Sequence, residues 1–196
     1  MTNEINQNPS IKVVLLGNSG VGKTSVVFRW TTGSWEPLIR PTVGANHQRK
    51  LVHLDNQDVE VYLWDTAGQE QFQALTPLYA RSSYCAIIMV SINDQNSFNS
   101  IDVWKELLQT SCEHYPPCIL AVNKIDLEDS NGADRNRIDQ KFADQFDSIM
   151  YISALSGEGI DNLFLYAAQV GYNFFKRNTA KKKTIDIQET KKSGCC

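Results

Sequence analysis

Apolar positions along the chain alternate between short continuous runs and longer segments in which they recur with helical spacing. A continuous apolar run of strand length is typical of a strand that is buried on both faces of a parallel sheet. Mainly apolar runs of this length, some interrupted by one polar residue, occupy residues 11–16, 59–64, 86–91, 119–123 and 150–153, and a weaker pattern indicates an edge strand at residues 48–55. Apolar residues recur as on one face of a helix at residues 22–31, 101–108, 138–146 and 160–167.

This alternation of strands and helices predicts an α/β fold, with a six-stranded, mostly parallel sheet and helices on both of its faces. Only residues 56–58 separate the strand at 48–55 from the strand at 59–65, which is the length of a hairpin link. Hairpin links join antiparallel strands. The sheet is therefore expected to contain one antiparallel strand.

The chain is expected to form one domain at residues 11–176, because residues 1–10 and 177–196 lack periodic apolar positions and are predicted to be flexible. Its net charge of −3 is unevenly distributed, since residues 176–196 carry +5 and the preceding residues −8. An acidic body argues against a nucleic-acid partner, and a basic tail fits an anionic membrane surface. The polar N-terminus is no secretory signal and the longest apolar stretch is too short to span a bilayer, so a cytoplasmic protein is expected.

A phosphate-binding motif follows the first apolar run. Residues 17–24, G-N-S-G-V-G-K-T, match G-x-x-x-x-G-K-[ST] between a strand and a helix, which is the context that the motif requires. Its glycines let backbone N–H groups converge on a phosphate, and the start of the helix adds its dipole. Lys23 is expected to bridge the outer two phosphates, and Thr24 to offer its hydroxyl to Mg²⁺. The predicted nucleotide-binding residues of this loop are Asn18, Ser19, Gly20, Val21, Gly22, Lys23, Thr24 and Ser25.

A second motif indicates which base the nucleotide carries. Asn123, Lys124, Ile125 and Asp126 form N-K-x-D directly after an apolar strand. A carboxylate there can accept hydrogen bonds from both N1–H and the 2-amino group of guanine, a donor pair that adenine lacks. The alkyl stem of Lys124 can lie along the base plane. The motif predicts guanine specificity, because it lies at the carboxyl end of a strand and accompanies a phosphate loop.

The residues expected to respond to the γ-phosphate lie after the strand at 59–64 and in the loop before the strand at 48–55. Asp65 is well placed to hold Mg²⁺ through water, Gly68 to bring its N–H to the γ-phosphate, and Gln69 to orient an attacking water. Thr42 can reach Mg²⁺ and the γ-phosphate, although taken alone it is an ordinary loop residue. Gln69 and Lys23 are the predicted catalytic residues.

Together these motifs resemble a Rab-type member of the Ras superfamily of small GTPases, over residues 10–176 and the last two cysteines. Its guanine-nucleotide motifs have counterparts at residues 17–25, Thr42, 65–69, 123–126 and Ser153–Ala154. The resemblance implies that Trp35 packs on the guanine, and that the N–H of Ala154 meets its O6 atom.

The chain departs from the Rab pattern at several positions. Leu155, assigned to the nucleotide site, stands where Rabs usually have lysine, which puts the affinity for guanine in question. His47 replaces a phenylalanine of an aromatic triad that effectors recognise, whereas Trp64 and Tyr79 match its other two members. The partners of well-known Rabs therefore cannot be transferred to this chain.

The resemblance implies a membrane-trafficking switch that binds GTP and GDP with Mg²⁺ and is lipidated at Cys195 and Cys196. Two prenyl groups give stable anchoring where one is marginal. The implied partners are an exchange factor, a GTPase-activating protein, effectors, a GDP-dissociation inhibitor and a prenyltransferase escort. No arginine of the chain is assignable to catalysis, so intrinsic hydrolysis is expected to be slow, of order 10⁻⁴ s⁻¹. The run at residues 75–79 resembles endocytic Rabs, which favours an endosomal membrane.

Three alternatives remain open at this stage. A pseudo-GTPase scaffold is suggested by Leu155 and His47 and opposed by the intact phosphate-site residues. An adenine-specific ATPase or kinase is opposed by Asp126. A Rho or Ras branch is opposed by the terminal Cys-Cys pair and by the lack of a Rho-type insert.

Overall fold

The computed structural model describes residues 8–54, 57–69, 74–127 and 135–192, with residues 181–192 described by their backbone alone. Six strands form one sheet in the order β2-β3-β1-β4-β5-β6. β2 is antiparallel to β3 and every other pair is parallel, which confirms the predicted architecture. The strands are β1 (Ser10–Leu16), β2 (Ala45–Leu54), β3 (Gln57–Thr66), β4 (Cys85–Ser91), β5 (Cys118–Asn123) and β6 (Ser148–Tyr151).

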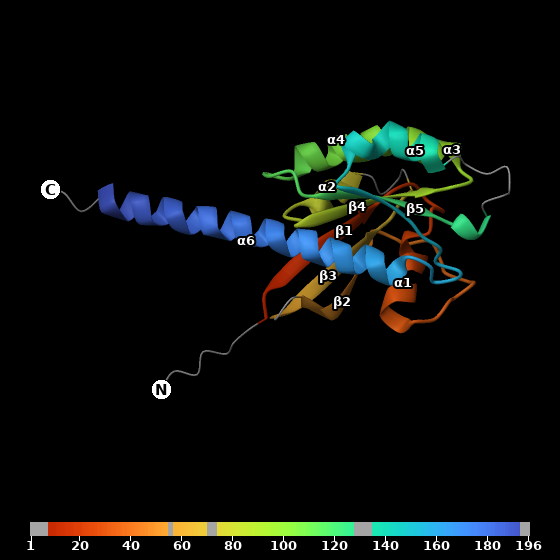
Figure 1. Cartoon of the computed structure of the whole chain (residues 1–196), viewed down its shortest axis with the longest axis horizontal. Helices are drawn as coiled ribbons and strands as arrows, with labels where there is room; N and C mark the ends of the chain where they lie inside the picture. The colour runs from red at the N-terminus through yellow and green to blue at the C-terminus, as the bar shows by residue number, and fades with distance from the viewer. Residues whose placement is uncertain (1–7, 55–56, 70–73, 128–134, 193–196) are drawn as a thin grey trace.

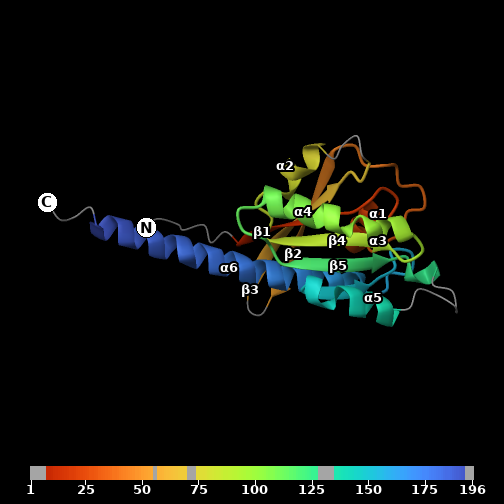
Figure 2. The same ribbon diagram turned by 90° about the horizontal axis from the view of Figure 1, so that it is seen from above.

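Helices cover both faces of the sheet, as Figures 1 and 2 show. α1 (Lys23–Thr32) and α6 (Ile160–Lys192) lie on one face, with α4 (Ile101–Ser111) and α5 (Arg135–Phe142) on the other. The alternation of side chains along β1 explains the two layers. Val13 and Leu15 belong to the core under α1 and α6, whereas Val14 and Leu16 belong to the core under α4 and α5. Both faces of the strand are thus buried, as its continuous apolar run requires.

Two short helices, α2 (Thr76–Ala80) and α3 (Gln95–Asn99), are absent from the sequence prediction. A helix of five residues is little more than one turn, so it shows no apolar periodicity. Local features set both starts, since Pro77 lies in the first turn of α2 and the carboxylate of Asp94 accepts the N–H of Asn96 at the start of α3, at 3.0 Å.

The last helix runs past residue 176, the expected end of the domain, and α6 continues as helix to Lys192 through the segment that is expected to be a flexible tail. Figure 1 shows this part of α6 projecting from the body of the domain. Residues 177–192 contain neither glycine nor proline, and lysine, glutamate and glutamine are good helix formers, so nothing in the sequence ends the helix earlier. The flexibility of this segment relative to the domain remains a prediction.

Within the described ranges, no helix is long and apolar enough to cross a membrane.

Candidate functional site

The predicted motifs meet at one edge of the sheet, beyond the carboxyl ends of β1, β3 and β5. Gly17 directly follows β1, Asp65 lies at the end of β3, and Asn123 is the last residue of β5. Ligands of α/β sheets bind beyond the carboxyl ends of strands. We call residues 17–25 with Thr42, Asp65, Gly68 and Gln69 the phosphate end, and residues 123–126 with 153–157 the guanine end.

The phosphate loop requires glycine where its backbone turns. Gly17 has φ of 140° and Gly22 has φ of 98°, both in the region that side chains disfavour. A Cβ at Gly17 would also collide with the carbonyl oxygen of Met89, and one at Gly22 with the side-chain amide of Asn123. The loop is therefore fitted closely against β4 and β5, and the N–H of Ser19 donates to the carbonyl oxygen of Gly68 at 3.1 Å.

Lys23 begins α1 and is almost entirely buried, with 5% of its surface exposed. Its ammonium group donates hydrogen bonds to the carbonyl oxygens of Gly17, at 2.7 Å, and Asn18, at 3.0 Å. Burial lowers the pKa of Lys23 to about 8, and the negative charge of Asp65 offsets only part of this shift. A buried cation held by neutral carbonyls is well prepared to exchange them for phosphate oxygens.

Three oxygen-bearing side chains converge beside Lys23. The hydroxyl groups of Thr24 and Thr42 are 2.7 Å apart, and both donate to the same carboxylate oxygen of Asp65, at 2.7 and 3.2 Å. The other oxygen of Asp65 is buried and has no hydrogen-bond partner. Burial raises the pKa of Asp65, with the hydroxyl of Thr24 and the charge of Lys23 opposing that shift.

This oxygen set fits Mg²⁺. Hard divalent cations prefer carboxylate, hydroxyl and water oxygens, and a cation near Asp65 would satisfy its unpartnered oxygen. Among the described residues, no group of three or more His, Cys, Asp or Glu side chains forms a metal cluster. Mg²⁺ usually binds one or two carboxylates besides water and phosphate oxygens, and the single carboxylate of Asp65 matches this preference.

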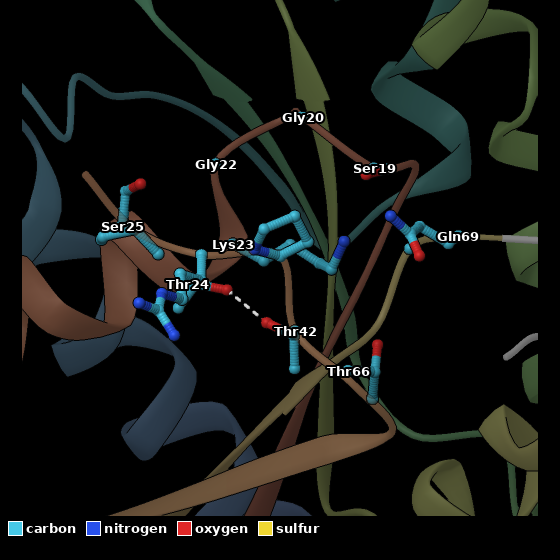
Figure 3. Close-up of a pocket in the computed structure, with 13 residues that line it drawn as sticks. Ser19, Gly20, Gly22, Lys23, Thr24, Ser25, Thr42, Thr66 and Gln69 are labelled. Carbon is cyan, nitrogen blue, oxygen red and sulfur yellow. Dashed lines mark hydrogen bonds between the residues drawn. The ribbon is translucent and has the colours of Figure 1, made fainter. Parts of the chain in front are cut away.

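A pocket of about 220 Å³ lies between the phosphate loop and the loop that carries Thr42, as Figure 3 shows. Thr24, Thr42 and Gln69 extend toward it from three different segments. The lining residues that the sequence predicted are Ser19, Gly20, Gly22, Lys23, Thr24, Ser25, Thr42, Gly68 and Gln69. Sequence reasoning missed Ile39, Arg40, Pro41 and Thr66. The nearness of Arg40 to Thr42 in the chain was the only available signal for it.

Asn18 and Val21 of the phosphate loop do not line this pocket. The amide of Asn18 turns toward α4, where it donates to the hydroxyl of Ser100 at 2.9 Å and accepts the indole N–H of Trp104 at 3.1 Å. The carbonyl oxygen of Val21 accepts from Asn123 at 2.8 Å. Contacts between these two residues and a nucleotide remain predictions.

Asn123 joins the two ends of the site. Its amide nitrogen donates to Val21 in the phosphate loop, and its amide oxygen accepts the N–H of Ala154 at 3.2 Å. Since Asn123 is almost fully buried, these bonds are shielded from water. The asparagine of the N-K-x-D motif therefore holds both loops at a fixed separation.

Asp126 is held by the second loop of the guanine end. The hydroxyl of Ser153 donates to one oxygen of Asp126 and also accepts the N–H of Ser156 at 3.0 Å. Lys124 adopts a left-handed backbone, with φ of 66°, as the chain turns between β5 and Asp126. Asp126 itself is exposed, so its carboxylate is accessible to a base.

Two predicted base contacts lie at the surface. Trp35 is 38% exposed and Leu155 is 49% exposed, and neither lines the phosphate pocket. Packing of either residue on a base remains a prediction.

The aromatic triad is assembled on the face of β2 and β3 beside α2. The ring centroid of Trp64 lies 5.7 Å from that of His47 and 5.9 Å from that of Tyr79. The histidine thus takes the place of the expected phenylalanine without breaking the row of rings.

Comparison with known proteins gives consistent matches. The Ras family model matches residues 12–172. Ras-related protein Rab-22A of Homo sapiens is 41% identical over 163 residues, covering 79% of this chain and 80% of that protein. Ypt/Rab-type GTPase Rab7 of Gibberella zeae is 34% identical over 155 residues, covering 77% and 76%. Ras-related protein Rab-7b of Paramecium octaurelia is 31% identical over 199 residues, covering 94% and 96%.

Proposed function

The chain belongs to the Ras family as a Rab-type small GTPase that hydrolyses GTP and acts in membrane trafficking, and from this premise we propose which of its residues operate the GTP/GDP switch. The observation that carries the proposal is the hydrogen-bonded connection between the two ends of the site. Asn123 holds the phosphate loop at Val21 and the guanine end at Ala154. One nucleotide can therefore contact both ends.

In the proposed complex, the phosphates lie on the N–H groups of residues 18–25, and Lys23 replaces its two carbonyl partners with β- and γ-phosphate oxygens. Thr24, Thr42 and, through water, Asp65 hold Mg²⁺. The cation supplies neutralisation of phosphate charge when it is bound. Asp126 accepts from the guanine N1–H and 2-amino groups, and the N–H of Ala154 donates to O6.

Hydrolysis follows from positioning, because phosphoryl transfer demands little covalent chemistry of the protein. Gln69 lines the pocket beside Gly68 and orients the attacking water. Lys23 stabilises the charge that develops on the phosphate oxygens as the bond to the leaving group breaks.

The same residues make the site a switch. Thr42 and Gly68 both contact the γ-phosphate in the GTP state, which orders the loops on either side of the pocket, and its loss releases them. Effectors would recognise the ordered state at the surface that carries His47, Trp64 and Tyr79.

No observation favours the alternative of a scaffold without hydrolysis. Lys23, Thr24 and Gln69 all line the pocket, and Asp65 accepts from both threonines beside it.

A direct test is to purify the full chain with Mg²⁺, denature it, and identify the released nucleotide by ion-exchange chromatography. GDP in near-equal molar amount is expected, because a site that holds both ends of the nucleotide releases it slowly. An empty site would count against tight guanine binding, and an adenine nucleotide would overturn the role of Asp126.

The proposed membrane anchor is the pair Cys195 and Cys196, which lies outside the described residues. Two geranylgeranyl groups give stable attachment to the cytoplasmic face of an intracellular membrane, with an endosomal membrane favoured by the run at residues 75–79. Basic residues 181–183 and 191–192 add attraction to anionic lipids of roughly 1 kcal/mol each. Changing both cysteines to serine is expected to move the protein from the membrane fraction to the cytosol. A double variant that stays on membranes would exclude this anchor.

The proposed regulators are those of the Rab cycle: an exchange factor, a GTPase-activating protein, a GDP-dissociation inhibitor and a prenyltransferase escort. We assign no catalytic role to Arg40, which lines the pocket, and propose that the activating protein supplies the catalytic arginine, worth roughly 10³ to 10⁵ in rate.

A further inference from the structure

The loop at residues 153–157 has to be held still if it is to recognise a base. It carries Ala154, and its Ser153 hydroxyl holds Asp126. Its own turn is closed by a hydrogen bond from the N–H of Gly157 to the carbonyl oxygen of Ser153, at 2.8 Å. Leu155, at its tip, is half exposed and offers no polar group to hold the loop in place.

A side chain of α1, the helix that follows the phosphate loop, reaches this loop. Arg29, in the last turn of α1, donates from Nη2 to the carbonyl oxygen of Ser156, at 2.9 Å. The two residues are 127 positions apart in the chain. Because α1 begins at Lys23, this bond connects the helix that carries the phosphate-binding lysine directly to the guanine end.

The guanidinium group also packs against Gly157. A Cβ built at Gly157 would lie 2.7 Å from Nη2 and 2.9 Å from Nε of Arg29, and Gly157 has φ of 90°. The glycine thus provides both the turn and the space in which the guanidinium lies. A lysine could reproduce the single hydrogen bond but not this packing, because its ammonium lacks the planar fork.

The helix that carries Arg29 is itself well fixed at this end. The next residue, Trp30, stacks on Phe164 of α6 with ring centroids 4.5 Å apart, and its carbonyl oxygen accepts from Lys50 at 2.8 Å. Gly33 caps the helix by donating its N–H to the carbonyl oxygen of Arg29, at 2.9 Å. Arg29 therefore extends from a rigid support toward the outer part of the loop, Ser156 and Gly157, and adds to the hydrogen bonds that Asn123 and Asp126 make with its inner part.

We propose that Arg29 is a positioning residue for guanine recognition, which holds Ser156 and Gly157 so that Ser153 aligns Asp126 and Ala154 meets the base. The proposal rests on the assignment of Asp126 and Ala154 to guanine made above. It also explains how the guanine end tolerates Leu155, because the loop is held by Asn123 and Arg29 and not by a side chain at its own tip.

The test compares GDP with inosine diphosphate (IDP), which lacks only the 2-amino group that Asp126 is expected to accept. Dissociation rates of both nucleotides are measured for the full chain with Mg²⁺, in the wild type, Arg29→Gln and Arg29→Lys. Loss of one charged hydrogen bond is expected to accelerate GDP release about tenfold in Arg29→Gln. IDP release should accelerate less in this variant, so the preference for GDP over IDP shrinks. Arg29→Lys should retain part of the preference that Arg29→Gln loses.

Arg49→Gln is the matched control, because Arg49 is an exposed arginine of β2 that pairs with Glu60 and belongs to neither end of the site. It should leave both rates unchanged. Gly157→Ala is the reciprocal variant, since its Cβ displaces the guanidinium, and it should also shrink the preference for GDP.

The outcomes distinguish a failure of the role proposed for Arg29 from a failure of the role assigned to Asp126. If Arg29→Gln and Arg29→Lys both keep the wild-type preference for GDP over IDP, the positioning role is wrong, even if their melting temperatures fall. Should Arg29→Gln fail to fold, Arg29→Lys decides by the same ratio, a smaller preference supporting the role and an unchanged one excluding it. A wild type that does not distinguish GDP from IDP would overturn the assignment of Asp126 itself, and with it this proposal.

Discussion

The phosphate end and the guanine end differ in what holds them in place. The phosphate end is formed by backbone that only glycine can follow and by buried charges, Lys23 and Asp65. The guanine end combines buried residues with the exposed Asp126, and it is held by hydrogen bonds of the side chains of Asn123, Ser153 and Arg29. Burying Lys23 and Asp65 costs folding free energy, and binding of phosphate and a cation can offset this cost.

Because of this difference, we expect the phosphate end to set the affinity for all nucleotides and the guanine end to set the selectivity between bases. Every nucleoside diphosphate carries the same phosphates, so changes at the phosphate end should weaken all of them equally. Changes at the guanine end should alter the ratio between bases. The predictions below test that separation, and the GDP-to-IDP ratio is the quantity that distinguishes the two ends.

The largest effect is expected at Gln69, which bears on the reaction and not on binding. Gln69→Leu keeps a side chain of similar size in the pocket but cannot orient water. Hydrolysis stimulated by an activating protein should fall by roughly 10³-fold or more, because the stimulated rate depends on an ordered water. Single-turnover hydrolysis would measure this, with GDP and GTP dissociation rates as the control. Normal stimulated turnover would exclude the role assigned to Gln69.

Lys23→Met should produce the largest loss of binding. Removing a buried cation that contacts two phosphates is expected to cost about 2–5 kcal/mol of affinity for GDP and for IDP alike. The unliganded fold should change little, since the relief from burying an ammonium is offset by the loss of two hydrogen bonds to carbonyl oxygens. Calorimetry with both nucleotides tests this. A selective loss of GDP binding would contradict the separation of the two ends.

Asp126→Asn changes the guanine end, so it should alter the selectivity between bases. An amide cannot accept from both N1–H and the 2-amino group, so GTP and GDP affinity should fall about a hundredfold, the equivalent of about 3 kcal/mol. The amide offers an N–H to the C2 carbonyl of xanthine, so xanthosine nucleotides should bind better than to the wild type. Unchanged GTP affinity would mean that Asp126 does not recognise guanine.

The sequence predicts an element well when several neighbouring residues together form a recognisable pattern. Buried strands such as β4 and β5 were predicted from unbroken apolar runs, and the phosphate loop from a motif in its required context. The one-turn helices α2 and α3 have no period to detect. The part of α6 past residue 176 has no apolar period, so its polarity indicates a flexible tail, although its residues favour helix.

Within the site, the sequence located residues that carry motifs but not residues that support them. Arg29 contacts Ser156, which lies 127 positions away in the chain. The side chain of Asn18 donates to Ser100 at the start of α4, and the phosphate-loop motif does not indicate this contact. Contacts of this kind arise only when the sheet brings distant loops together. They are therefore available from the structure alone.

The smallest expected effect lies at Ser100, which supports the phosphate loop from outside the pocket. Its hydroxyl accepts from Asn18 at 2.9 Å, donates to the carbonyl oxygen of Asn96 in α3 at 3.0 Å, and makes no capping bond to α4, although Ser100 precedes that helix. Ser100→Ala should therefore loosen the loop by about 0.5–1.5 kcal/mol without unwinding α4. GDP and IDP release should both accelerate a few-fold, with their ratio unchanged. Thr110→Ala on the same helix is the control, because its hydroxyl bonds only to carbonyl oxygens of α4. A change in the GDP-to-IDP ratio in Ser100→Ala would show that Asn18 influences the guanine end, and the two ends would then have to be treated as one unit.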